Sequence, residues 1–222
     1  MKTENEHDQT TCQSTINSTE WVGRTIEIDD AGTGDLVGDA FIGFRDTESG
    51  KVIFRSVPVG LYNKDNREND RDKKHILKVV KEGLKALHHR KGDRILFCRG
   101  NCFDLVREYL DENNIYYEPA IVEGELQDEV EGRFVQHLRK LGVSSNSLTT
   151  ESGAKRYFIL FNWVCRDFPN RERYVKTGFP SWGRKWRKIA QKRYNKSKNN
   201  LKQERKQIKE RAQEILNNIL AA

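Results

Sequence analysis

The stretch Arg24–Gly38, RTIEIDDAGTGDLVG, contains the features that decide the fold. It begins with a short β-rich run that places Ile26 and Ile28 on one face of a strand. Asp29 and Asp30 follow where this run stops, and carboxylates at a strand end indicate a binding site. The glycines that come next allow a tight turn and the close approach of a ligand to the backbone. The alternative is a hairpin with solvated acids, because Asp, Gly and Thr are ordinary turn residues.

Two further strands are expected directly after this stretch. Asp39–Arg45 and Lys51–Val59 are apolar runs, and the polar segment between them has hairpin length and ends in Gly50. Together with the opening strand they predict a three-stranded antiparallel meander. The charged segment Asn63–Lys74 is expected to be a loop or an accessible edge.

Helices and strands then alternate. Apolar residues at helical spacing predict crossover helices, and short apolar runs predict the strands between them. The expected order is helix 76–87, strand 94–98, helix 102–112, strand 116–122 and helix 126–141. We therefore expect an α/β fold, in which a mixed five-stranded sheet with right-handed connections is flanked by helices.

The charge of the chain is concentrated at its C-terminal end. The 222 residues are 36% hydrophobic and 33% charged, which suits one core of ordinary size with an appendage. The net charge is +7, but residues 183–222 hold 13 Lys and Arg against three Glu, or +10, so the preceding chain carries −3. The basic character belongs to the tail.

Four segments are expected. Residues 1–20 are polar and predict a disordered leader. Residues 21–142 form the α/β core, and residues 143–182 form a helical extension packed on it. Residues 183–222 form a basic helical tail.

The cysteines and the hydropathy pattern indicate a cytoplasmic protein with no membrane partner. Cys12, Cys98, Cys102 and Cys165 form neither a CxxC pair nor a zinc-ligand pattern, which is typical of free thiols in a reducing compartment. The polar N-terminus lacks the apolar region of a signal peptide, and no segment approaches the roughly 20 apolar residues of a membrane span.

The order of elements resembles the ribonuclease H-like superfamily, which includes ribonuclease H, Holliday-junction resolvases and actin-like ATPases. Asp30-Ala31-Gly32-Thr33 resembles the D-x-G-T motif that ends the first strand of resolvase-like members. The resemblance covers about Arg24–Leu141 and matches no single family. It implies a ribonuclease H-like sheet and a nuclease or resolvase-like phosphodiesterase that uses Mg²⁺ or Mn²⁺. Two such ions about 3.5 to 4 Å apart need clustered oxygen ligands.

The same resemblance implies a set of catalytic and metal-binding acids. Asp30 matches the first-strand position, and Asp29 is its close competitor. In the last helix of the core, Glu125 and Asp128 share a face, and Glu123 precedes them at the strand end. The implied catalytic residues are Asp30, Glu125 and Asp128, and Asp29 and Glu123 complete the metal-binding set. Alternatively, acids in the first turn of a helix only complement its dipole.

The end of the fourth strand departs from the nuclease pattern. Phe97-Cys98-Arg99-Gly100 has no carboxylate, although Arg99 is suited to contact a phosphate. A second hypothesis is therefore a non-catalytic nucleic-acid-binding protein with a degenerate ribonuclease H-like core. A third, an actin-like ATPase with Gly32-Thr33-Gly34 as a phosphate loop, requires a duplicated domain, and no second D-x-G-T strand is present.

The basic tail predicts a nucleic-acid partner, DNA or RNA. Its cations neutralise phosphates, and its interleaved aromatic rings can stack on exposed bases. The expected contact residues are Arg184, Lys185, Trp186, Arg187, Lys188, Lys192, Arg193 and Tyr194. A solvated basic helix and an anionic membrane surface are the alternatives. The stripe Ile208, Ala212, Ile215 and Ile219 further predicts a protein partner or self-association through the last helix.

Overall fold

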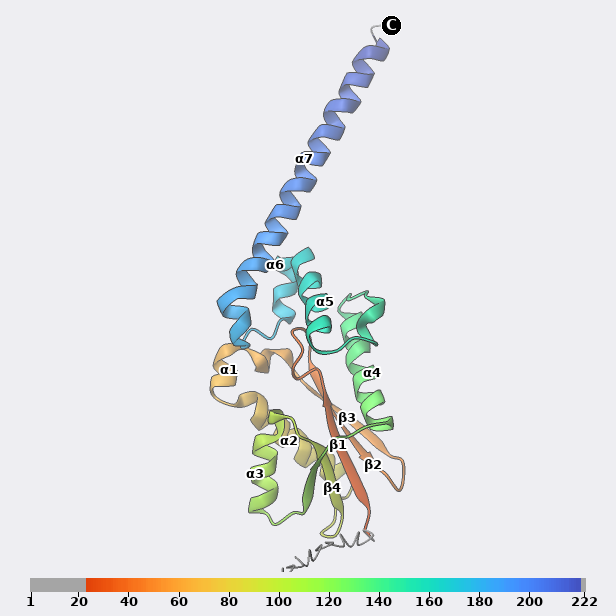
Figure 1. Cartoon of the computed structure of the whole chain (residues 1–222), viewed down its shortest axis with the longest axis vertical. Helices are drawn as coiled ribbons and strands as arrows, with labels where there is room; N and C mark the ends of the chain where they lie inside the picture. The colour runs from red at the N-terminus through yellow and green to blue at the C-terminus, as the bar shows by residue number, and fades with distance from the viewer. Residues whose placement is uncertain (1–22, 221–222) are drawn as a thin grey trace, which may run out of the picture.

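A mixed sheet of five strands lies at the centre of the chain in the computed structural model, which describes residues 23–220 (Figure 1). The strand order is β3-β2-β1-β4-β5; β1 pairs antiparallel with β2 and parallel with β4. The strands are β1 Thr25–Ala31, β2 Ala40–Asp46, β3 Val52–Val57, β4 Arg94–Cys98 and β5 Tyr117–Ala120. The expected mixed α/β sheet is thus confirmed, while the leader 1–20 and Cys12 lie outside the described residues.

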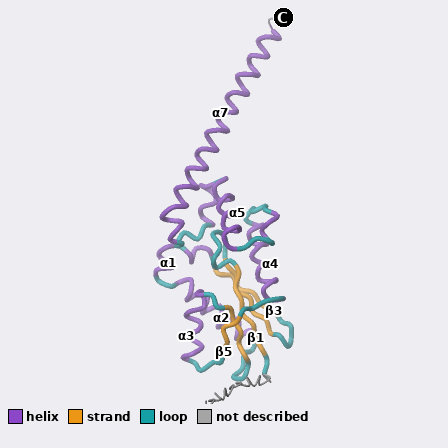
Figure 2. Tube along the Cα trace, in the orientation of Figure 1, coloured by secondary structure: helices purple, strands orange, loops and turns teal. Residues whose placement is uncertain are grey.

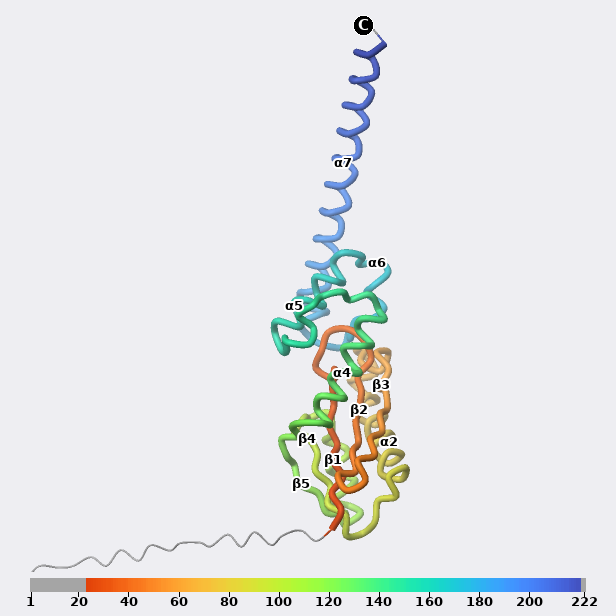
Figure 3. The backbone as a smooth tube through the Cα atoms, turned by 90° about the vertical axis from the view of Figure 1, so that its right-hand side faces the viewer, coloured from red at the N-terminus to blue at the C-terminus, as the bar shows by residue number. Residues whose placement is uncertain are grey.

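Helices cover both faces of this sheet (Figures 1 and 3). On one face, α2 (Arg71–Ala86) and α3 (Asp104–Glu112) share a buried apolar cluster with Ile26 and Ile28 of β1. On the other face, α4 (Glu125–Lys140) packs on β1 and β2. Side chains alternate between the two faces along a strand, so successive residues at the end of β1 point to different helical layers.

The connections differ from expectation in two places. The segment expected to be a loop contains a short helix, α1 (Lys64–Glu68), because the Asn63 side chain caps it by accepting the Asn66 N–H at 2.8 Å. The helix expected from residue 102 is preceded by a 3₁₀ turn that begins at Asn101, and α3 starts at Asp104. The 3₁₀ turns are η1 Val59–Tyr62, η2 Asn101–Phe103, η3 Asn146–Leu148 and η4 Glu172–Tyr174.

The C-terminal third is helical and packs beside α4. α5 (Gly153–Arg166) and α6 (Phe168–Arg171) lead to a π-helical turn, η5 (Trp182–Trp186), and then to α7 (Arg187–Leu220). Trp182 and the start of α7 belong to the same buried cluster as α4 and α5. The rest of α7 projects away from the molecule as a single helix (Figures 1 and 2), and residues 201–220 are all exposed.

Exposure along α7 follows from its sequence. Its residues are mostly charged or amide side chains, so an isolated helix surface is compatible with water. Large apolar side chains nevertheless stay exposed there, among them Ile208 at 66% and Ile219 at 67%. Within residues 23–220, no helix combines the length and the apolar character needed to cross a membrane.

Candidate functional site

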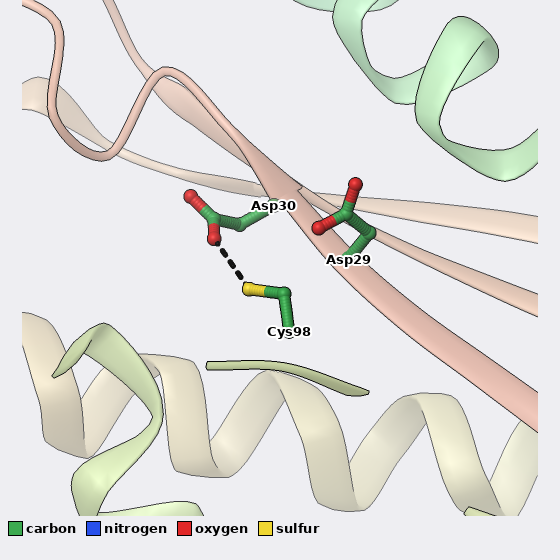
Figure 4. Close-up of side chains that lie close together, drawn as sticks. All are labelled: Asp29, Asp30 and Cys98. Atoms are coloured by element: carbon green, nitrogen blue, oxygen red, sulfur yellow. Dashed lines mark hydrogen bonds between the residues drawn. The ribbon is translucent and has the colours of Figure 1, made fainter. Parts of the chain in front are cut away.

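Two carboxylates and a thiol meet at the C-terminal end of the central strand (Figure 4). The pairing of β1 with β4 ends at Ile28 and Phe97, so Asp29 and Asp30 extend past the paired region while Cys98 closes β4. Asp29, Asp30 and Cys98 each offer a ligand atom, and these atoms lie within 4.8 Å of one another. The end of β1 therefore collects the polar groups that its sequence indicated.

Asp30 is held by three donors on the side of the sheet that α2 and α3 cover. The Cys98 thiol donates to Oδ1 at 3.1 Å, and the Cys102 thiol donates to the same oxygen at 3.6 Å. The Thr33 hydroxyl donates to Oδ2. These hydrogen bonds restrict the orientation of the Asp30 carboxylate. Asp30 is consequently positioned before any ligand arrives.

Asp29 is buried, and its surroundings disfavour the charged form of its carboxyl. Burial raises the pKa of its carboxyl from 3.8 to about 6, and the neighbouring charges of Asp30 and Glu131 contribute to this rise. Figure 4 draws its carboxyl beside the Asp30–Cys98 hydrogen bond, and its ligand atom lies within 4.8 Å of those of Asp30 and Cys98. A nearby cation would reverse this electrostatic balance, because a positive charge favours the carboxylate form.

The loop after β1 is shaped by a glycine and tied down by a buried lysine. Gly32 has φ +82°, and a Cβ there would come within 2.5 Å of the Phe134 ring, so the turn requires glycine. The Lys176 ammonium donates to the Gly32 carbonyl, and the Lys176 N–H donates to the Leu36 carbonyl at 2.9 Å. Lys176 is fully buried, and this burial lowers its pKa to about 7. The chain before η5 thus holds the loop that carries the acids.

A buried arginine links three separate segments near the same loop. Arg156 of α5 binds Asp35 at 3.1 Å and Glu131 of α4 at 2.7 Å, and only 7% of Arg156 is exposed. Burial raises the pKa of Asp35, and the Arg156 charge opposes this rise. The ion pairs fix the position of Glu131 beside the end of β1.

A pocket of about 600 Å³ opens over this end of β1. Acids and the backbone of the 32–35 turn form one part of its lining, and aromatic side chains of α5 and η5 form another. Its acidic side chains are Asp30, Asp35 and Glu131, and its aromatic side chains are Tyr157, Phe158 and Trp186. Its volume falls within the roughly 300 to 1,000 Å³ of ligand pockets.

The acids that the sequence selected are only partly brought together. Among the described residues, the close ligand group contains Asp29 and Asp30 but none of the α4 acids. Glu125 binds Arg45 at 2.5 Å, and Asp128 and the preceding Glu123 are exposed. The sequence interpretation missed Glu131, which lies about 9 Å further along the helix axis than Glu125.

The signal that would have found Glu131 is its spacing. It follows Asp128 by three residues and therefore shares a helix face with it. The sequence showed only that Cys98 occupies a strand end where an acid was expected, and it did not indicate that the Cys98 thiol contacts Asp30. Arg156 gives no signal, because a single arginine on a helix is ordinarily exposed.

The predicted nucleic-acid contact residues fall into two groups. Arg184, Lys185, Lys188 and Lys192 are exposed, and so is Arg99 in the turn after β4. The others help to attach α7 to the core. Arg187 binds Glu172 at 2.5 Å, Arg193 donates to Asn162 at 3.1 Å, and the Trp186 and Tyr194 rings pack against the buried cluster.

Fold and site together define an α/β protein with a mixed five-stranded sheet, an acidic site at the end of the central strand and a projecting basic helix. A scan against protein-family models and a search among curated proteins gave no match.

Proposed function

We propose that the core is ribonuclease H-like and that the protein is a divalent-metal-dependent nuclease or resolvase-like phosphodiesterase acting on nucleic acid. One observation carries this proposal. Asp29 and Asp30 lie at the end of the central strand of a sheet ordered β3-β2-β1-β4-β5, and Glu131 of the covering helix α4 lines the same pocket as Asp30.

The residues at this site fit Mg²⁺ or Mn²⁺. Asp29 and Asp30 supply the hard carboxylate oxygens that these ions prefer, and Glu131 supplies a third carboxylate nearby. Burial and the neighbouring negative charges together raise the pKa of Asp29, and a bound cation would offset both. Cys98 is a soft donor and a poor ligand for these ions, and we assign its thiol to the hydrogen bond with Asp30.

A bound divalent ion would supply an activated water and stabilise the charge that develops on the phosphate. The chain itself positions the ligands. Thr33 and Cys98 orient Asp30, Arg156 holds Glu131, and Lys176 holds the Gly32 turn. Glu123, Glu125 and Asp128 stay predictions as further ligands.

The basic helix α7 supports a nucleic-acid substrate. Arg184, Lys185, Lys188 and Lys192 are exposed at or beside its start, close in sequence to Trp186 in the pocket lining. A row of exposed cations neutralises phosphates without reading the bases. We propose that this surface binds the nucleic-acid backbone while one phosphodiester reaches the acidic cluster.

Cleavage by matched variants tests the proposal. Labelled single-stranded, duplex and four-way-junction substrates are incubated with wild-type protein in Mg²⁺, Mn²⁺ or EDTA. Asp30→Asn and Glu131→Gln should each lower cleavage at least about tenfold, because each removes one charge from the site at nearly constant volume. Glu129→Gln, an exposed acid on the same helix, should cleave like the wild type. Full activity of Asp30→Asn would refute the assignment.

One observation favours the alternative of a non-catalytic nucleic-acid-binding protein. The end of β4, where nuclease members of the superfamily carry a carboxylate, carries Cys98. Under this alternative the wild type binds the substrates above and cleaves none of them in either metal. A Mn²⁺ soak with anomalous scattering would then show no ion between Asp29 and Asp30.

A further inference from the structure

The pocket over β1 has an aromatic wall that the metal chemistry does not use. Phe158 of α5 is 46% exposed although it is large and apolar, and it lines the same pocket as Asp30 and Glu131. Large apolar side chains left open beside a polar pocket mark surfaces that bind a partner. In the sequence this residue is one apolar position among many in α5 and carries no signal of its own.

Neighbouring rings hold Phe158 in place. Its ring meets the Trp186 and Tyr157 rings almost at right angles, with centroids 5.6 Å apart in both pairs. Trp186 in turn contacts the buried Phe161 ring at 5.0 Å. A ring fixed in this way loses little conformational freedom when a ligand stacks on it. Trp186, expected to stack by itself, therefore also supports Phe158.

The charges around this wall select the chemistry of the occupant. Lys185 lies over the Trp186 ring at 4.8 Å, and Arg184 and Lys188 are exposed nearby along the chain. A ligand with a flat ring next to an anionic group satisfies both the aromatic and the basic surfaces. An unpaired nucleotide in a nucleic-acid strand has this composition, since every base presents a π-face.

We propose that Phe158, supported by Trp186, is a stacking platform for one unpaired base adjacent to the phosphodiester held at the acidic cluster. The inference rests on the proposed nucleic-acid function and specifies its substrate, a single-stranded or locally unpaired segment. A base within a duplex is stacked on its neighbours and does not present its face to Phe158. The platform thus favours single strands over fully paired duplexes.

Fluorescence of 2-aminopurine tests this platform without cleavage. The full chain is titrated in EDTA with a single-stranded oligonucleotide that carries 2-aminopurine at each position in turn, and with the same oligonucleotide in a duplex. Stacking on Phe158 should quench the fluorescence at one or two positions. Phe158→Leu should abolish this quenching and weaken single-strand binding by about 5- to 150-fold, with an unchanged salt dependence, because stacking releases no counterions.

Two controls separate loss of the ring from loss of the fold. Phe158→Tyr keeps the aromatic face and should bind and quench like the wild type. Ile121→Ala removes another exposed apolar side chain, 72% exposed, in the segment after β5, and should also have no effect. Wild-type quenching by Phe158→Leu would overturn the proposal, and so would an equal loss of affinity for single strand and duplex.

The outcome is separable from that of the catalytic assignment. If Asp30→Asn loses cleavage while Phe158→Leu keeps the quenching, the nuclease stands and the platform is refuted. If the wild type never cleaves but Phe158→Leu loses the quenching, the stacking platform is supported and the protein binds nucleic acid without cleaving it. Absence of binding to every oligonucleotide, both in EDTA and in Mg²⁺, overturns both.

Discussion

Replacing Asp29 by Asn should stabilise the metal-free protein while it abolishes metal-dependent cleavage. Asp29 is 7% exposed, and burial beside Asp30 and Glu131 raises its pKa from 3.8 to about 6. At neutral pH the folded state must therefore keep an unfavourable buried charge. Asn has nearly the same shape as the protonated carboxyl and carries no charge.

The magnitude follows from the pKa shift. Below pH 3.8 the carboxyl is protonated in both folded and unfolded states, so the shift has no effect on stability. Between pH 3.8 and about 6 the folded state retains a proton that the unfolded state has lost, so stability falls as pH rises. Above pH 6 the cost is complete and amounts to about 3 kcal/mol.

Urea unfolding in EDTA at about pH 4, 5.5 and 7.5 measures this difference. The free energy of unfolding of Asp29→Asn should exceed that of the wild type by up to about 3 kcal/mol near pH 7.5, and the excess should nearly vanish near pH 4. Added Mn²⁺ should raise the midpoint of the wild type more than that of the variant. An Asp29→Asn protein that is equally or less stable at neutral pH in EDTA would refute this electrostatic reasoning.

Four further outcomes are expected. The pKa of Lys176 is lowered from 10.5 to about 7, so between about pH 7 and 10 the unfolded state holds a proton that the folded state has lost. The free energy of unfolding of the wild type should therefore rise by up to about 1.4 kcal/mol per pH unit in this range. Lys176→Met should lack this rise in parallel urea titrations. Arg156→Met should lower the free energy of unfolding by about 3 to 5 kcal/mol, because it removes the partner of both Asp35 and Glu131. A urea midpoint equal to that of the wild type would contradict a stabilising role for these ion pairs. Truncation after Asn200 should leave the melting temperature unchanged, as residues 201–220 are exposed. Replacing Arg184, Lys185, Lys188 and Lys192 by Ala should flatten the salt slope of nucleic-acid binding by up to about 0.9 for each phosphate that is no longer neutralised, and an unchanged slope would show that the phosphates bind elsewhere.

Much of the fold was predictable because its signals are local. The alternation of Ile26 and Ile28 marks a strand, and the stripe Val130, Phe134 and Leu138 marks a helix with one buried face. The order of strands and helices predicts a mixed sheet, since short links make antiparallel pairs and helical links make parallel ones. The acids at the end of β1 were visible for the same reason, as a strand end is a local feature.

The partners of those acids depended on contacts between distant segments. Sequence patterns do not distinguish the α4 acids Glu125, Asp128 and Glu131 from one another. The position of α4 along the sheet decides which of them lies near Asp29. That position is set by packing, with Phe134 close against Gly32. No periodicity encodes it, because each helical turn repeats the same pattern.

The tertiary structure also decided which charged side chains are buried. Lys176 belongs to a stretch rich in charged residues, 171–177, yet the 32–38 loop and the Tyr62 ring enclose it. The sequence places Trp186 in the basic tail, but in the structure Trp186 lines the pocket together with side chains of α5. The sequence by itself determined the sheet, its covering helices and the acids at the strand end; the tertiary structure decided which charges and rings surround them, because burial depends on neighbours remote along the chain.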